Sequence, residues 1–288
     1  MRRSAGRRLA GLFHGRRPLQ VGSLLAAPGA WLVVLYLGSL SLLLVTAFWT
    51  VDPLSGEVVK GFSWENFEAL FTEPVYREVV WRTVRTAALV TLTDAIIAFP
   101  IAFYMAKVAS PRGKALLVVG VLMPLWSSYL VKVLSWRTML SENGVLNWLL
   151  EPIGLSSPGY GLTAVWLVMS YLWLPYMILP IYAGLERIPN SLISASEDLG
   201  AAPFTTFRRV ILPLAFPAVV AGSIFTFSLT LGDFIAVRLV SNSQFIGTVI
   251  SSSITNDLPF AAALAMVPIV VMIAYLGVAR KLGAFEHV

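Results

Sequence analysis

Long apolar runs separated by short polar segments dominate the pattern of this chain of 288 residues. Each run holds about 20 residues or more, the length that an α-helix needs to cross the hydrocarbon core of a bilayer. The pattern therefore predicts an all-α membrane protein with six transmembrane helices. The predicted spans cover residues 24–49, 79–107, 115–134, 162–184, 214–237 and 261–279.

Prolines interrupt several of these runs, which membrane helices tolerate where neighbouring groups satisfy the freed carbonyls. Pro100, Pro175 and Pro180 lie inside predicted spans. Pro124, in MPLWSSYL, predicts that the third span is split into two shorter segments.

Composition supports a membrane protein, because 57% of the residues are hydrophobic and only 12% are charged. The charged share of a soluble domain is roughly 25%, so this chain cannot supply a polar surface. The chain has no cysteine, and its two histidines, His14 and His287, lie in opposite tails. These counts exclude disulfides, thiolate chemistry and a histidine cluster, so we expect no metal site and no cofactor in this chain.

Basic residues predict the orientation. Residues 1–23 form a basic tail before the first span. The first span is longer than the apolar run of a signal peptide, and no signal-peptide cleavage site follows it. If this tail lies in the cytoplasm, fourteen of the 21 Lys and Arg residues lie on that side. They are six arginines in the tail, three basic residues in each of two connections and two after the last span. This bias predicts a multi-pass membrane protein with both termini in the cytoplasm. The net charge of +6 is thus a topology signal, and no nucleic-acid partner is expected.

The connections on the other side predict two short amphipathic helices. In the first, SWENFEALF, we expect Trp64, Phe67 and Phe71 to face inward or toward headgroups. The second lies within residues 138–161. Residues 24–288 are predicted to form one six-helix transmembrane domain.

One polar connection, residues 186–213, contains residues that are typical of helix starts and helix ends. Asn190 or Ser191 suits a helix N-cap, and Gly200 suits a left-handed C′ position. Pro203 suits the first turn of a second helix that runs toward Ile211. We expect two short helices that form a rigid projection, residues 190–213, called the knob below.

The knob resembles the EAA loop of ATP-binding-cassette (ABC) importer permeases, in which glutamate, two alanines and a glycine precede isoleucine-x-leucine-proline. Ser194 stands at the glutamate position, and Glu197, nearly one turn later, is a candidate for its docking contact. The resemblance implies a type I (MetI-like) six-helix architecture and a loop that docks on the ATPase subunit. The matching residues are Ser194, Ala195, Ser196, Gly200, Val210, Leu212 and Pro213.

The resemblance also implies a location in the bacterial inner membrane. It implies three kinds of partner: a second homologous permease subunit, two copies of an ABC ATPase subunit and an extracytoplasmic substrate-binding protein. The chain has no G-x-x-x-x-G-K-[ST] motif, so we expect ATP hydrolysis in a separate subunit and no enzymatic activity here. The segments FSWENFEALF, MPLWSSYLVKVLSWRTMLSENGVLN and SEDLGA resemble spermidine/putrescine permeases, most closely the first of that system's two permease subunits. Permeases for iron, thiamine, molybdate and phosphonate share much of this pattern.

Acidic residues inside spans are costly unless they face a cavity or a partner. Asp94 and Asp233 are therefore candidates for the transport pathway, and the resemblance implies a role for Asp233 with a cationic substrate. Asp233 has the alternative of pairing with Arg238, and Asp94 that of a structural carboxyl. Aromatic rings are candidates for cation–π contacts with ammonium groups, or else pack helices. They are Trp126, Tyr129, Trp166, Tyr171, Trp173 and Tyr176.

Two other classes of membrane protein fit this sequence less well than an importer subunit does. A secondary transporter or channel would show a buried charge relay or inverted repeats, whereas this chain offers two isolated aspartates and no repeat. An intramembrane enzyme has no nucleophile–base set here. The importer subunit is the interpretation that the sequence favours.

Overall fold

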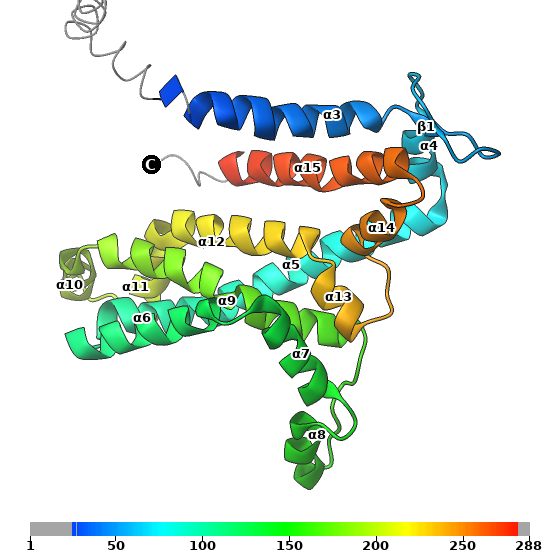
Figure 1. Cartoon of the computed structure of the whole chain (residues 1–288). Helices are drawn as coiled ribbons and strands as arrows, with labels where there is room; N and C mark the ends of the chain where they lie inside the picture. Colours follow the sequence, from blue (N-terminus) through cyan, green and yellow to red (C-terminus); the bar gives the residue numbers. More distant parts are fainter. Residues whose placement is uncertain (1–24, 27, 282–288) are drawn as a thin grey trace, which may run out of the picture.

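The computed structural model describes residues 25–26 and 28–281, and the predictions made for residues 1–23 and for His287 lie outside them. The long helices α3, α15 and α12 lie roughly parallel, with the knob at one end of the molecule and the β1–β2 hairpin at the other (Figure 1). We call these the knob end and the hairpin end. The helix α7 turns away from the bundle and leads to α8.

The elements follow one another with short connections. In chain order they are η1 (Leu32–Leu37), α3 (Gly38–Thr46), β1 (Thr50–Val51), β2 (Val58–Val59), α4 (Glu65–Thr72), α5 (Pro74–Phe103), η2 (Tyr104–Val108), α6 (Pro111–Trp126), α7 (Tyr129–Leu140), α8 (Val145–Leu150), η3 (Glu151–Ile153), α9 (Leu162–Arg187), α10 (Asn190–Asp198), α11 (Pro203–Thr206), η4 (Phe207–Ile211), α12 (Leu212–Gly232), α13 (Ile235–Val240), α14 (Ile246–Ser253) and α15 (Leu258–Lys281).

Five of the described helices are long and apolar enough to cross a bilayer, and the bent pair α6–α7 makes a sixth if it counts as one span. The two helices of this pair meet at an angle of 92°. The predicted split of the third span is therefore confirmed, and the break falls at Ser127 and Ser128, just after Pro124.

The predicted end of the fifth span was wrong. We expected an uninterrupted helix over residues 214–237, but α12 ends at Gly232. The Asp233 carboxylate accepts the backbone N–H of Ala236 at 3.0 Å, in the first turn of a new short helix, α13, whose N-cap residue is Phe234. A side chain that competes for backbone donors ends one helix and begins the next.

Helices α5, α9 and α12 form the centre of the bundle, and small residues allow α9 and α12 to approach closely. A Cβ atom added to Gly184 would lie 2.3 Å from the Cβ of Ala218, and one added to Gly222 would lie 2.8 Å from the sulfur of Met177. Such small-residue contacts are how helices pack in a medium that gives no hydrophobic drive between them.

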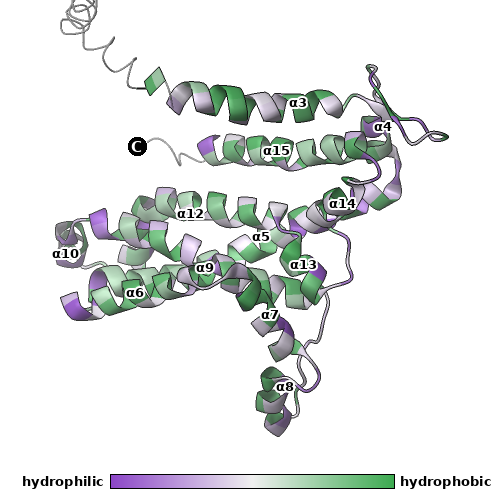
Figure 2. Cartoon of the chain, in the orientation of Figure 1, coloured by the Kyte–Doolittle hydropathy of each residue, from purple (hydrophilic) through white to green (hydrophobic). Residues whose placement is uncertain are grey.

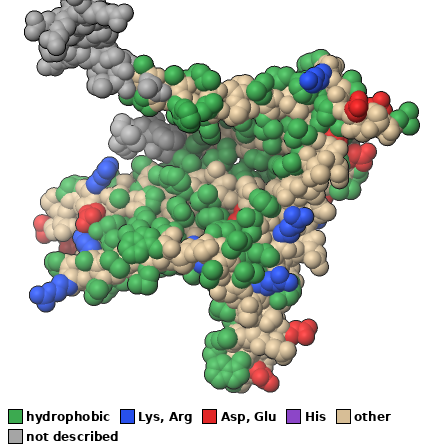
Figure 3. Space-filling model, viewed as in Figure 1, with side chains coloured by type: hydrophobic (Ala, Val, Ile, Leu, Met, Phe, Trp, Pro, Cys, Tyr) green, Lys and Arg blue, Asp and Glu red, His purple; other side chains and the backbone are tan. Residues whose placement is uncertain are grey.

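The exterior is apolar over most of the length of the helices. Hydropathy colouring shows apolar residues along α3, α12 and α15, with polar residues concentrated toward the ends of the molecule (Figure 2). The space-filling view shows the same on one face, where most Lys, Arg, Asp and Glu side chains lie toward the ends and around α7 and α8 (Figure 3). This surface suits a hydrocarbon solvent.

At the hairpin end, α4 is the predicted first amphipathic helix. Its Asn66 side chain donates to the carbonyl oxygens of Ala47 and Trp49 at 3.0 and 2.8 Å, which fixes α4 against the end of α3. Phe67 packs on Phe48, whereas Trp64 and Phe71 are exposed. In the hairpin turn, backbone N–H groups of Leu54 and Ser55 hydrogen-bond the Asp52 carboxylate and lower its pKa.

Candidate coupling loop and transport site

The knob is built as two short helices around a left-handed glycine. Helix α10 has Pro189 at its N-cap, so the predicted caps Asn190 and Ser191 are wrong by one or two positions. Gly200 has φ +78°, which confirms its predicted left-handed conformation. The hydroxyls of Ser196 and Thr206 are 2.9 Å apart and join α10 to α11.

We expected the second knob helix to end where the next span begins, but the two are continuous. Residues Pro203–Gly232 form one continuous helix of 30 residues, with a π-helical turn at Phe207–Ile211. Leu212 and Pro213 therefore lie inside this helix and are not at a joint. At 1.5 Å per residue it is about 45 Å long, so one rigid element leads from the knob to Asp233.

Two lysines anchor the base of the knob, and sequence reasoning missed both roles. Lys107 donates to the Ile188 carbonyl at 2.6 Å and to the Asn190 side chain at 3.1 Å. Lys114 pairs with Glu186 at 2.7 Å. These bonds tie the knob to the ends of α5 and α6. Only the three-dimensional arrangement could reveal them, because the partners are more than 70 residues apart.

The knob presents an exposed tip. Ser194, Ala195 and Glu197 are exposed on α10, and Ser196 is half-buried. Leu199 is 89% exposed and Phe204 is 71% exposed on either side of Gly200. These two apolar side chains were not predicted as site residues. The signal that could have identified them is their position on either side of Gly200 in an otherwise polar connection.

At the opposite end of the continuous helix, Asp233 meets the predicted pathway residue Tyr129. The Tyr129 hydroxyl on α7 donates to the Asp233 carboxylate. The Tyr129 ring stacks on Trp173 of α9 with centroids 6.2 Å apart, and Trp173 lies 6.0 Å from Tyr176. We call these four residues the Asp233 site. It combines one carboxylate with three half-buried aromatic rings.

The alternative partner of Asp233 is not engaged. The described residues hold two salt bridges, Arg82–Glu78 and Lys114–Glu186, and neither involves Arg238. The nearby cation Lys132 donates to the Pro124 carbonyl at 3.1 Å, at the C-terminal end of α6. A cation is favourable at a helix C-terminus, so Lys132 stabilises the α6–α7 bend. Asp233 therefore has no cationic partner among the described side chains.

No hydrogen bond or aromatic contact joins Asp94 or Trp126 to the Asp233 site among the described residues. The Asp94 side chain is fully buried in the α5–α9–α12 core, and neither carboxylate oxygen has a hydrogen-bond partner among the described residues. The Ser170 hydroxyl faces it from α9 without reaching hydrogen-bonding geometry. Trp126 is 84% exposed at the end of α6. The pathway roles of Asp94 and Trp126 stay predictions.

Comparison with protein families matches residues 79–282 to the family described as "Binding-protein-dependent transport system inner membrane component". The chain is 41% identical to the inner membrane ABC transporter permease protein YdcU of Escherichia coli (strain K12), over 97% of this chain and 95% of that protein. It is 34% identical to the spermidine/putrescine transport system permease protein PotB of Haemophilus influenzae, over 82% of this chain and 85% of that protein.

Solved structures show the same fold at low sequence identity. A bacterial ABC transporter involved in import of the acidic polysaccharide alginate has a chain with a TM-score of 0.72 and 19% identity, covering 95% of this chain and 99% of that one. The MetNI methionine ABC transporter, in an inward-facing conformation, has a TM-score of 0.58 and 16% identity, covering 74% of this chain and 97% of that one. These likenesses confirm the predicted MetI-like architecture.

Proposed function

Because the chain belongs to the family of binding-protein-dependent transport system inner membrane components, we propose that it translocates a polyamine-type organic cation. Membership makes it a multi-pass inner-membrane permease subunit of an ABC importer, which is not itself an ATPase. It implies an ATPase and a periplasmic binding protein as partners. We propose further that a second homologous permease and two ATPase copies complete the transporter.

In this proposal the knob end lies in the cytoplasm and the knob docks on an ATPase subunit. The exposed Leu199, Phe204 and Glu197 are the contact candidates. Lys107 and Lys114 hold the base of the knob, so movement of the ATPase is passed to the helix Pro203–Gly232 rather than lost in a flexible loop. Tilting of this helix moves Asp233 and switches access from one side to the other.

The observation that carries the substrate class is the Asp233 site. A carboxylate that has no cationic partner among the described residues, next to the rings of Tyr129, Trp173 and Tyr176, has the chemistry that recognises an alkylammonium group. The similarity to a spermidine/putrescine permease supports the same class. Fe³⁺ prefers several oxygen or nitrogen ligands, and the Asp233 site offers one carboxylate.

The test is polyamine uptake by the complete transporter in proteoliposomes, with its cognate binding protein. We expect Asp233→Asn to reduce spermidine and putrescine uptake at least about 30-fold, since losing one partner of a desolvated charge pair costs about 2 kcal/mol or more. Glu142→Gln, an exposed carboxylate in the connection between α7 and α8, is the control and should leave uptake unchanged. Unchanged polyamine uptake in Asp233→Asn, or a cognate binding protein that prefers an anion, would refute the substrate class.

A further inference from the structure

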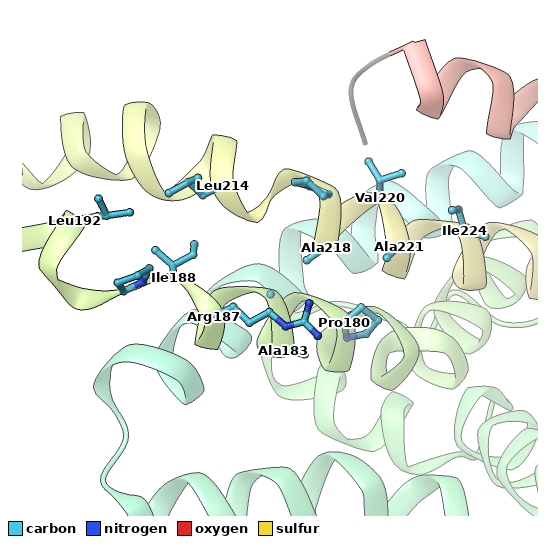
Figure 4. A pocket seen from close by; sticks show the side chains of 13 residues that line it. Pro180, Ala183, Arg187, Ile188, Leu192, Leu214, Ala218, Val220, Ala221 and Ile224 are labelled. Atoms are coloured by element: carbon cyan, nitrogen blue, oxygen red, sulfur yellow. The ribbon is translucent and has the colours of Figure 1, made fainter. Parts of the chain in front are cut away.

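A groove of about 460 Å³ lies between α9 and α12 at the root of the knob (Figure 4). Its walls carry prolines and small or aliphatic side chains, and α10 contributes Leu192 at the knob end. Arg187 is the one charged residue among those that line it, and its side chain lies along the groove toward Pro180 (Figure 4).

The groove continues the face of α9 that carries the aromatic rings of the Asp233 site. Trp173, Tyr176, Pro180, Ala183 and Arg187 follow one another at intervals of three or four residues, so they share one side of the helix. Pro180 has no N–H, so the carbonyl of Tyr176 lacks its usual intrahelical donor.

Arg187, in the last turn of α9, has no ion-pair partner among the described residues. No hydrogen bond or ion pair joins its guanidinium to any other part of the chain that the structure describes. The neighbouring carboxylate, Glu186, is bound to Lys114. An unpaired charge beside low-dielectric walls acts over a longer range than one in open water.

We propose that this groove is the release vestibule of the transport path, and that Arg187 repels the cationic substrate there and so opposes its return. The inference rests on the proposed organic-cation substrate. A cation leaving the carboxylate and rings of the Asp233 site passes from an attractive to a repulsive potential along one face of α9. Its residence in the vestibule is thereby shortened, and re-entry from the release side is suppressed.

The experiment uses the complete transporter in proteoliposomes loaded with spermidine on the release side. Import of labelled spermidine is measured against the concentration inside. We expect Arg187→Gln to lower the half-inhibitory internal concentration about tenfold and Arg187→Glu to lower it further, because attraction replaces repulsion. Putrescine, with fewer charges, should show a smaller shift, and added salt should reduce both shifts.

Arg187→Lys keeps the charge and should behave as the unmodified chain, which separates charge from packing. Arg112→Glu, exposed at the start of α6 and outside the groove, is the matched control and should have no effect. Equal shifts in Arg112→Glu, or no shift in Arg187→Glu, would overturn the vestibule. The vestibule would also be overturned if the Arg187 variants only impaired assembly of the transporter. That result is expected if a partner helix or a lipid fills the groove. If the unmodified transporter imports no polyamine, the proposed function fails and this inference fails with it.

Discussion

At the scale of single residues, two intramembrane aspartates have opposite environments. Asp233 is satisfied twice, by the Tyr129 hydroxyl and by the Ala236 N–H. An arriving ammonium group can replace Tyr129 as the donor while Ala236 still holds the carboxylate in place. Asp94 is buried without a hydrogen-bond partner in the described chain, and such a group costs about 1–3 kcal/mol. A cost of this kind is typical of a group retained for function.

We therefore expect Asp94→Asn to impair transport and to leave stability nearly unchanged. Asparagine has almost the same shape and is equally short of hydrogen-bond partners in this site, so the midpoint of thermal unfolding should change by no more than a few degrees. In the transport cycle, we expect Asp94 to gain a hydrogen-bond partner when α5, α9 and α12 shift. A hydrogen bond to a charged group contributes about 1.5 kcal/mol, so its loss in Asp94→Asn should reduce uptake about tenfold. Both are measured on the purified, reconstituted transporter.

Thr91→Val is the control, because the Thr91 hydroxyl is satisfied by the Ala87 carbonyl of its own helix. It should change neither unfolding nor uptake. Full uptake by Asp94→Asn would show that the carboxyl is structural.

At the scale of elements, the knob and the helix Pro203–Gly232 form one mechanical unit. Asn190 and Ile188 are bonded to Lys107, and Ser196 to Thr206, so neither knob helix can move without the other. The close approach of Gly184 to Ala218 also couples α9 to α12. A displacement of the knob is therefore carried along a stiff lever, about 45 Å long, to the Asp233 site.

Replacing residues 194–200 by a flexible glycine–serine segment of equal length should uncouple the transporter. The ATPase would still hydrolyse ATP, but hydrolysis should no longer respond to the loaded binding protein, and uptake should fall to background. The control is the same replacement in residues 154–160, a connection at the opposite end of the chain's long helices. Binding-protein-stimulated hydrolysis that survives the knob replacement would contradict the coupling role.

At the scale of the whole molecule, charge and apolar surface are segregated. The middle of the visible face is hydrophobic, and the charged side chains lie mostly toward the knob and hairpin ends (Figure 3). The basic bias of the sequence predicts that the knob end is cytoplasmic. The hairpin end, with α4 and the β1–β2 turn, would then face the binding protein.

This orientation can be tested directly because the chain has no native cysteine. Ser191→Cys in the knob should react with a membrane-impermeant maleimide only after the membrane is opened. Ser55→Cys in the hairpin turn should react in intact spheroplasts. Both positions are exposed. The reverse pattern would invert the topology, and equal labelling from outside would contradict an even number of spans.

Local features of the sequence by themselves determined the helical membrane architecture, the split third span and the left-handed conformation of Gly200. Burial of about 20 consecutive apolar residues and the conformational freedom of glycine are local properties that a sequence displays directly. The knob was also visible, since its turn residues and its resemblance to an EAA loop occupy one continuous segment.

Only the tertiary structure decided where the helices end and which side chains meet. The Asp233 carboxylate binds a local donor, the N–H of Ala236, but its second donor is the hydroxyl of Tyr129, 104 residues away on α7. The anchors Lys107 and Lys114 and the stacking of Tyr129 on Trp173 likewise depend on helices brought together from distant segments. Such contacts have no local signature, because the free energy that selects them comes from packing between helices.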